Sequence, residues 1–265
     1  MRILSQNLVL LGRRGLRGAG LLGVAAACGS CAKFPSNSAG NFTAITFTFQ
    51  VAGTINTTAP YIYDVAIAAS PLSPPNTTYA PLPVINSSNP NGRVSGSPTH
   101  FVEFNSLNPN SPLPFTLYRF ALSTEIPNPN DPTNPINLAH WAPSTRGQIF
   151  NFSTPQTGGD PSTLSFTVYT NELADTDAEA QQLQSLQVNI LTMTRLANVG
   201  SSQRIIDALG NSSTVSGLNQ FLVVDLRYNS TYSNVQMQLE PTGDTFNGTE
   251  PDVDISNFTI TVQRP

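Results

Sequence analysis

The chain has 265 residues, with 12 basic and 16 acidic side chains and a formal net charge of −4. Charged residues make up only 11% of the chain, against about 25% in a typical soluble domain, and Ser, Thr, Asn and Pro take their place. There is no basic excess to neutralise a phosphate backbone. This composition argues against a nucleic-acid partner and against electrostatic binding to anionic lipid.

The beginning of the chain has the pattern of an export signal. Arg13, Arg14 and Arg17 precede an apolar run at 19–27 that ends in small residues. This run has nine residues, too few for the helix of about 20 residues that crosses a bilayer. We therefore expect residues 1–27 to be a signal peptide. Arg13-Arg14 also leaves open a twin-arginine signal, which would export the folded protein.

Ala26-Ala27-Cys28 resembles the lipobox of bacterial lipoproteins. The resemblance implies cleavage before Cys28, acylation of that cysteine and a short lipidated tether over 28–41, with the membrane as partner. Gly29, where an aspartate would favour the inner membrane, implies the outer membrane or the cell surface. The alternative is an ordinary secreted protein cut in the alanine run. Cys28 and Cys31 also form a C-x-x-C, but neither a redox fold nor enough zinc ligands accompany it.

Cleavage after residue 27 would leave 8 basic and 16 acidic residues, a formal charge of −8. From residue 42 onward, apolar and polar residues alternate with the period of a half-buried strand. The pattern predicts about ten strands, near 44–51, 61–68, 101–104, 115–122, 149–152, 164–168, 186–190, 222–228, 235–239 and 258–262. Strands at this spacing favour an all-β protein, a β-sandwich of immunoglobulin-like or jelly-roll-like kind. We expect one body over 42–265; the alternative is two small sandwiches that meet near 171–184.

The segments between the strands are rich in Pro and Asn, which suit connections better than sheets. The longest predicted loops are 71–98, 107–114 and 127–145. Two short helices are expected. One begins at the capping box of Thr176 and Glu179 and ends near Leu183. The other runs over 203–209 with Gly210 as its stop.

Common catalytic motifs are missing from the sequence. It has no G-x-S-x-G and no H-E-x-x-H motif. The two histidines are His100 and His140. His100 and Glu103 should project to opposite faces of one strand, so we expect His100 to be a capping or solvent-facing residue. We predict no catalytic residues and no enzyme activity.

The sequence offers two candidate binding sites. Trp141 is placed in a loop, where its ring, with Tyr79, could stack on a sugar; it could equally close the edge of the core. Glu250, Asp252 and Asp254 alternate along an extended segment, so their carboxylates would share one side and could bind calcium. Solvated loop acids are the plainer interpretation of these three residues.

The sequence thus favours a lipid-anchored, extracytoplasmic β-sandwich with a structural or binding role, without cofactor unless calcium binds. Its partners would be the membrane and an envelope glycan or protein. A carbohydrate-binding surface module is the first alternative. An acid-pair glycan hydrolase is the second, because glycosidases use two carboxylates about 5–10 Å apart.

Overall fold

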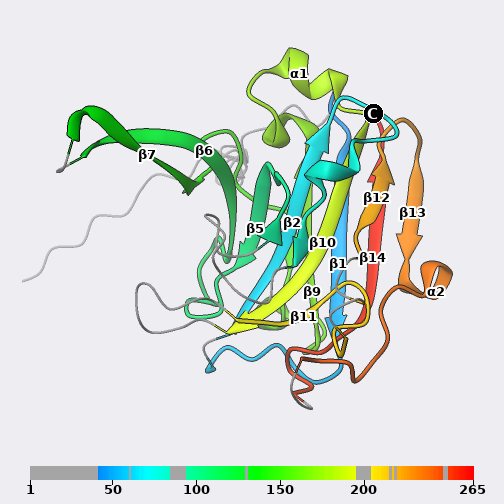
Figure 1. The fold of residues 1–265 in the computed structure, drawn as a ribbon. Coiled ribbons are helices and arrows are strands. Elements are labelled where there is room, and N and C mark those ends of the chain that lie inside the picture. Colours follow the sequence, from blue (N-terminus) through cyan, green and yellow to red (C-terminus); the bar gives the residue numbers. More distant parts are fainter. Residues whose placement is uncertain are drawn as a thin grey trace, which may run out of the picture. The chain divides into compact units, whose positions relative to one another are not determined.

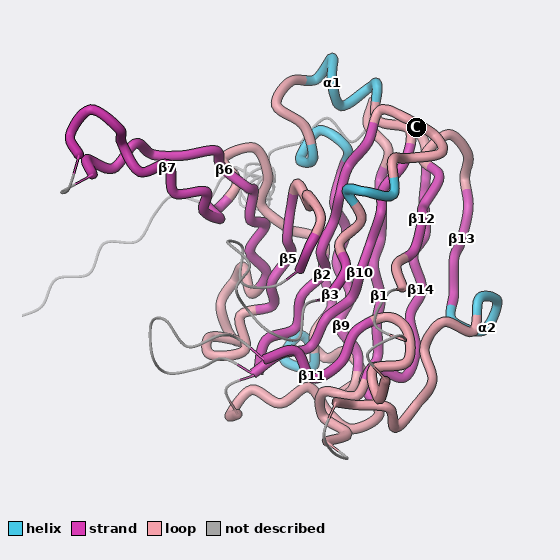
Figure 2. Tube along the Cα trace, in the orientation of Figure 1, coloured by secondary structure: helices cyan, strands magenta, loops and turns pink. Residues whose placement is uncertain are grey.

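The computed structural model describes residues 41–59, 61–83, 94–128, 131–194, 204–214, 217, 220–246 and 250–265 (Figure 1). The expected signal peptide 1–27 and Cys28 lie outside these residues, as does the tether up to residue 40. Ser38–Pro265 form one compact unit. Figure 2 shows that strands make up far more of the described chain than helices do.

The first sheet brings the two ends of the body together, because β1 pairs with β14 along its whole length. It is antiparallel throughout. Its order is β13 (Ser230–Ser233), β14 (Ile255–Gln263), β1 (Ala44–Val51), β9 (Thr163–Tyr169) and β8 (Phe152–Ser153).

The second sheet is centred on β10 and β2, which pair over ten residues. Its order is β11 (Arg204–Ala208), β10 (Ser185–Thr194), β2 (Tyr61–Ser70), β5 (His100–Phe104), β6 (Phe115–Asn128) and β7 (Asp131–Pro143). The short β12 (Leu222–Asp225) pairs with β10 beside β11, so two strands share one edge of β10. β3 (Leu82–Pro83) and β4 (Val94–Ser95) form a separate two-stranded ribbon.

The described part of the chain has few helices, and all of them are short. There are two α-helices, α1 (Asp177–Gln182) and α2 (Asn234–Met237). In addition there are three single turns of 3₁₀ helix, η1 (Thr77–Tyr79), η2 (Pro155–Thr157) and η3 (Thr170–Leu173). Among the described residues, no helix is long and apolar enough to cross a bilayer. The prediction of an all-β sandwich with one or two short helices is confirmed.

The main core lies between the two sheets. Alternate residues of β1 point into it, including Ile45, Phe47 and Phe49, which are almost fully buried. Phe166 of β9 links the sheets, because it stacks on Phe47 in its own sheet and contacts Phe115 of β6 in the other, with ring centroids 5.2 and 5.0 Å apart.

The outer face of the second sheet is covered as well. β10 is buried at nine of its ten positions, and a second apolar cluster includes Phe101, Leu191 and Met193. The loop after β2 contributes to the cover, since Asn189 donates from Nδ2 to the Pro81 carbonyl at 2.9 Å. Asn189 and Gln187, two buried polar residues on this face, therefore donate to loop backbone.

Three predicted elements are wrong. Residues 203–209, expected as a helix, contain β11, because Ile205 and Ile206 bury into opposite clusters as neighbours in a strand do. The predicted loop 127–145 is largely β7, an edge strand, where proline costs no ladder hydrogen bond. The predicted strand 235–239 begins as α2 instead, and its Val235 is 81% exposed.

Candidate functional site

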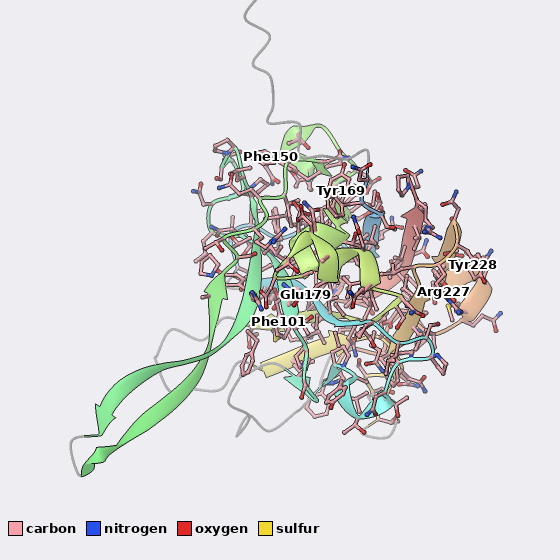
Figure 3. All side chains as sticks on the ribbon, turned by 90° about the horizontal axis from the view of Figure 1, so that it is seen from above. Phe101, Phe150, Tyr169, Glu179, Arg227 and Tyr228 are labelled. Atoms are coloured by element: carbon pink, nitrogen blue, oxygen red, sulfur yellow. The ribbon has the colours of Figure 1, made fainter. Side chains whose placement is uncertain are left out.

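A pocket of about 540 Å³ lies where β2, β5 and β6 meet the segment that contains η3 and α1. Figure 3 looks down on α1, with Glu179 labelled. Much of the wall is apolar, and the polar groups come from both sides. The lining residues used below are Ala69, Thr99, His100, Arg119, Phe120, Leu173, Ala174, Asp175 and Glu179.

Local hydrogen bonds fix the η3–α1 wall. The predicted capping box is confirmed: the Glu179 N–H donates to Thr176 Oγ1 at 3.2 Å, and the Thr176 N–H donates to Glu179 Oε2 at 3.0 Å. Arg146 donates from Nε to the Asn171 carbonyl at 3.1 Å, and its guanidinium also binds the Asp175 carbonyl and Asp177. Charge-assisted hydrogen bonds therefore hold this wall in η3 and at the start of α1.

An ion pair closes one side of the pocket. Arg119 of β6 pairs with Asp175, which lies between η3 and α1. Both side chains are exposed, so this pair contributes little to stability. The ion pair instead links the two walls of the pocket, because Arg119 belongs to β6 and Asp175 to the segment between η3 and α1.

His100 is buried rather than solvent-facing, which corrects the sequence-based expectation. It lies directly opposite Arg119 in the β5–β6 pairing. Burial, aided by the charge of Arg119, lowers its pKa from 6.5 to about 3, so the ring is neutral at pH 7. His140 lies in β7, opposite Ala121.

The imidazole of His100 lies in a hydrogen-bond network with Thr99 and the backbone of β2. Its Nδ1 is 2.9 Å from Thr99 Oγ1. That hydroxyl donates its single proton to the Ile67 carbonyl and accepts from the Ala69 N–H, at 3.2 and 3.1 Å. The Thr99 hydroxyl thus links the imidazole to the backbone of β2.

The carboxylates near the pocket are engaged too. Asp175 pairs with Arg119, and Glu179 caps α1. Glu172 is buried against Gly147 and accepts from the Tyr169 N–H at 2.8 Å; burial raises its pKa from 4.5 to about 7, but it does not line the pocket. Both acids that line the pocket therefore already have partners.

The two aromatic candidates, Trp141 and Tyr79, belong to different elements next to this pocket. Trp141, expected in a loop, is in strand β7 and pairs with Phe120, which lines the pocket. Tyr79 is in η1 and is 51% exposed. It lines an adjoining pocket of about 390 Å³ that shares Ala69, Pro71, Ser97 and Thr99 with the first.

The three acids predicted to bind calcium do not act together. Residues 251–253 form a turn, not an extended strand, and each acid has its own partners. Glu250 accepts from the Tyr61 hydroxyl, while Asp252 accepts from the Thr54 N–H and from Asn56 Nδ2, both at 3.0 Å. Asp254 instead accepts from the Gly243 N–H and is buried.

Asp254 belongs to a buried acidic cluster that the sequence did not predict. Asp207 of β11, Asp244 and Asp254 place carboxylate oxygens within 4.8 Å of one another. Glu240 lies close enough to interact electrostatically with all three. One signal was available: Asp207 interrupts an apolar run from Ile205 to Leu209. The other members come from separate segments, so no spacing could reveal them.

Burial raises the pKa of every acid in this cluster. The pKa of Asp207 is well above its usual range, and those of Asp244 and Asp254 are raised. Desolvation and the neighbouring carboxylates raise the pKa of Glu240 to about 11. Without a cation, the cluster must hold protons at neutral pH.

Comparison with known proteins gives no further guide to either site. No family model matches the chain, and no curated protein or solved structure is significantly similar to it.

Proposed function

We propose that this protein is an exported, lipid-anchored β-sandwich that binds a small, largely apolar ligand and catalyses no reaction. The observation that carries the binding role is the pocket between β5–β6 and η3–α1. Its volume, about 540 Å³, falls within the range of roughly 300–1,000 Å³ that is usual for small-molecule sites. Its apolar wall and few convergent polar groups are also typical of such sites.

The chemistry of the wall favours binding over catalysis. The histidine is buried and neutral, the threonine hydroxyl lies within hydrogen-bond distance of a backbone carbonyl, and both acids already have partners. These groups can orient a ligand without transferring a proton.

Filling the pocket tests the proposal. Ala174 lines the pocket, whereas Ala178 is an exposed residue of α1 that does not. We expect Ala174→Trp to weaken binding of the fluorescent probe 1-anilinonaphthalene-8-sulfonate at least tenfold, because the indole occupies the apolar space. Ala178→Trp, the matched control, should bind as the parent does. Equal probe binding by both variants and the parent would reject this pocket as the site.

The anchor part of the proposal is supported by the residues around Cys28. Two or three acyl chains hold a protein firmly at a membrane, whereas one holds it only marginally. Intact mass of protein extracted from membranes should show acyl mass on a chain that begins at Cys28. Cys28→Ser should remove both the acyl mass and the membrane association, while Cys31→Ser should keep them. Unchanged processing of Cys28→Ser would refute the anchor.

Carbohydrate binding is the second candidate, because the strand pairing puts Trp141 opposite Phe120 of the pocket. An aromatic face stacks on a sugar ring, so Trp141→Ala should abolish glycan-array binding while Trp141→Phe retains part of it. If the parent binds no glycan on the array, this candidate fails and the apolar-ligand proposal is unaffected.

A further inference from the structure

We propose that Asp207, Asp244 and Asp254, together with Glu240, form a buried calcium-binding site that fastens β11 to the start of β14 and to the loop between residues 240 and 246. The site shares only Asp254 with the three acids that alternate in the sequence. It is independent of the apolar pocket.

The geometry suits a single hard cation. The three aspartates place one oxygen each within 4.8 Å of the others. Two oxygens bound to one calcium ion at about 2.4 Å can lie up to about 4.8 Å apart, on opposite sides of the metal. All the candidate ligands are carboxylate oxygens, which favour calcium or magnesium over zinc or copper.

Two oxygens of the cluster have no hydrogen-bond partner among the residues that the structure describes. Oδ1 of Asp244 and Oε1 of Glu240 accept no hydrogen bond. Water cannot readily replace the missing partner, because the two residues are only 5% and 4% exposed. The other oxygen of each side chain is held by backbone: Ser212 N–H donates to Asp244 at 2.7 Å, and Gly210 N–H donates to Glu240 at 3.1 Å. One oxygen is fixed, and the other is left for a ligand.

No basic side chain of the described residues pairs with the cluster. In the described part of the chain, the ion pairs engage Asp175, Asp177 and Asp225, and none of the four clustered acids. Asp207 is held instead by N–H donors, from Ala208 at 2.9 Å and Ile255 at 2.6 Å. Four buried acids without a basic partner need either protons or a metal ion for charge balance.

A second pocket lies beside Glu240. This residue is in the wall of a pocket of about 460 Å³, whose other walls carry the amide side chains of Asn211, Gln220, Asn234 and Gln238. Calcium accepts amide and backbone carbonyl oxygens and tolerates irregular geometry. Magnesium prefers a strict octahedron and usually keeps several waters. A dense, buried set of carboxylates therefore favours calcium.

The test uses the full-length protein, stripped with EDTA and titrated with CaCl₂. Calorimetry should show one calcium ion bound per chain, and the midpoint of thermal unfolding should rise with calcium. Asp244→Asn should weaken calcium affinity at least tenfold. Asp252→Asn is the matched control, because Asp252 is an acid of the same segment as Asp254 but is bound by Thr54 and Asn56; it should bind calcium as the parent does.

Hydrogen exchange on the parent provides a readout that needs no variant. Calcium should slow exchange in peptides covering 204–214 and 240–256, and leave β1 unchanged. Absence of both a calcium heat and this protection would overturn the proposal. So would an equal loss of affinity in Asp252→Asn and Asp244→Asn. A parent indifferent to calcium and EDTA, with Asp244→Asn more stable in either, would show that protons balance the cluster instead.

Discussion

At the scale of single residues, the environment inside the sandwich decides the charge state of groups whose type alone says little. His100 is the clearest case. In an unfolded chain it would gain a proton near pH 6.5, but burial lowers its pKa in the fold to about 3. A histidine and a carboxylate separated by two residues in a strand suggested a solvent-facing ring. The structure buries both His100 and Glu103, because both faces of this sheet are covered.

This shift predicts a pH dependence of stability. Above pH 6.5, His100 is neutral in both states, and its full contribution is present. As the pH falls from 6.5 toward 3, only the unfolded chain takes up the proton, so the free energy of unfolding should fall by about 1.4 kcal/mol per pH unit from this group.

Urea unfolding of the parent and His100→Gln at pH 7, 6 and 5 checks the slope. The raised pKa of Glu172 acts in the opposite direction, since its stabilising effect grows as the pH falls from about 7 toward 4.5, but it is common to both proteins. Parallel curves for the two proteins would contradict the assignment to His100.

At the scale of elements, local sequence signals succeeded where they agreed with burial. The capping box of Thr176 and Glu179 predicted α1, and the alternation in 44–51 predicted β1. Signals failed where tertiary contacts opposed them. Residues 203–209, with Gly210 as the stop, resembled a helix, but Ile205 and Ile206 gain burial on both faces only as part of β11.

The capping box gives an element-scale prediction. Thr176→Ala removes the acceptor for the Glu179 N–H and should lower the free energy of unfolding by about 1 kcal/mol. Thr176→Ser keeps the hydroxyl and is the matched control. Equilibrium unfolding in urea measures both, and an equal effect of the two substitutions would exclude the cap as the cause.

At the scale of the whole molecule, two sheets share one aromatic core. Phe166 is fully buried and contacts rings from both sheets. Phe166→Ala should therefore cost about 3–5 kcal/mol of unfolding free energy, because it removes apolar contacts and leaves a cavity. Phe150→Ala is the same change at a side chain that is 42% exposed (Figure 3), and it should cost much less. Similar losses in thermal or urea unfolding for both variants would contradict this account of the core.

The sequence by itself determined the class of fold. Period-two alternation requires one buried face for each strand, and this physical constraint is local, so it can be read from neighbouring residues alone. The same holds for the cap of α1. The order of residues before Cys28 likewise supports an anchor without reference to any fold.

Only the tertiary structure decided the sites. Asp207, Asp244 and Asp254 lie up to 47 positions apart, and a single chain-local pattern cannot bring them together. The alternation of Glu250, Asp252 and Asp254 was a local pattern, but a turn gave each acid different partners. The pocket likewise depends on β6 meeting α1. Convergence of side chains depends on sheet order and on which loops cover each face, and these follow from packing of the whole chain.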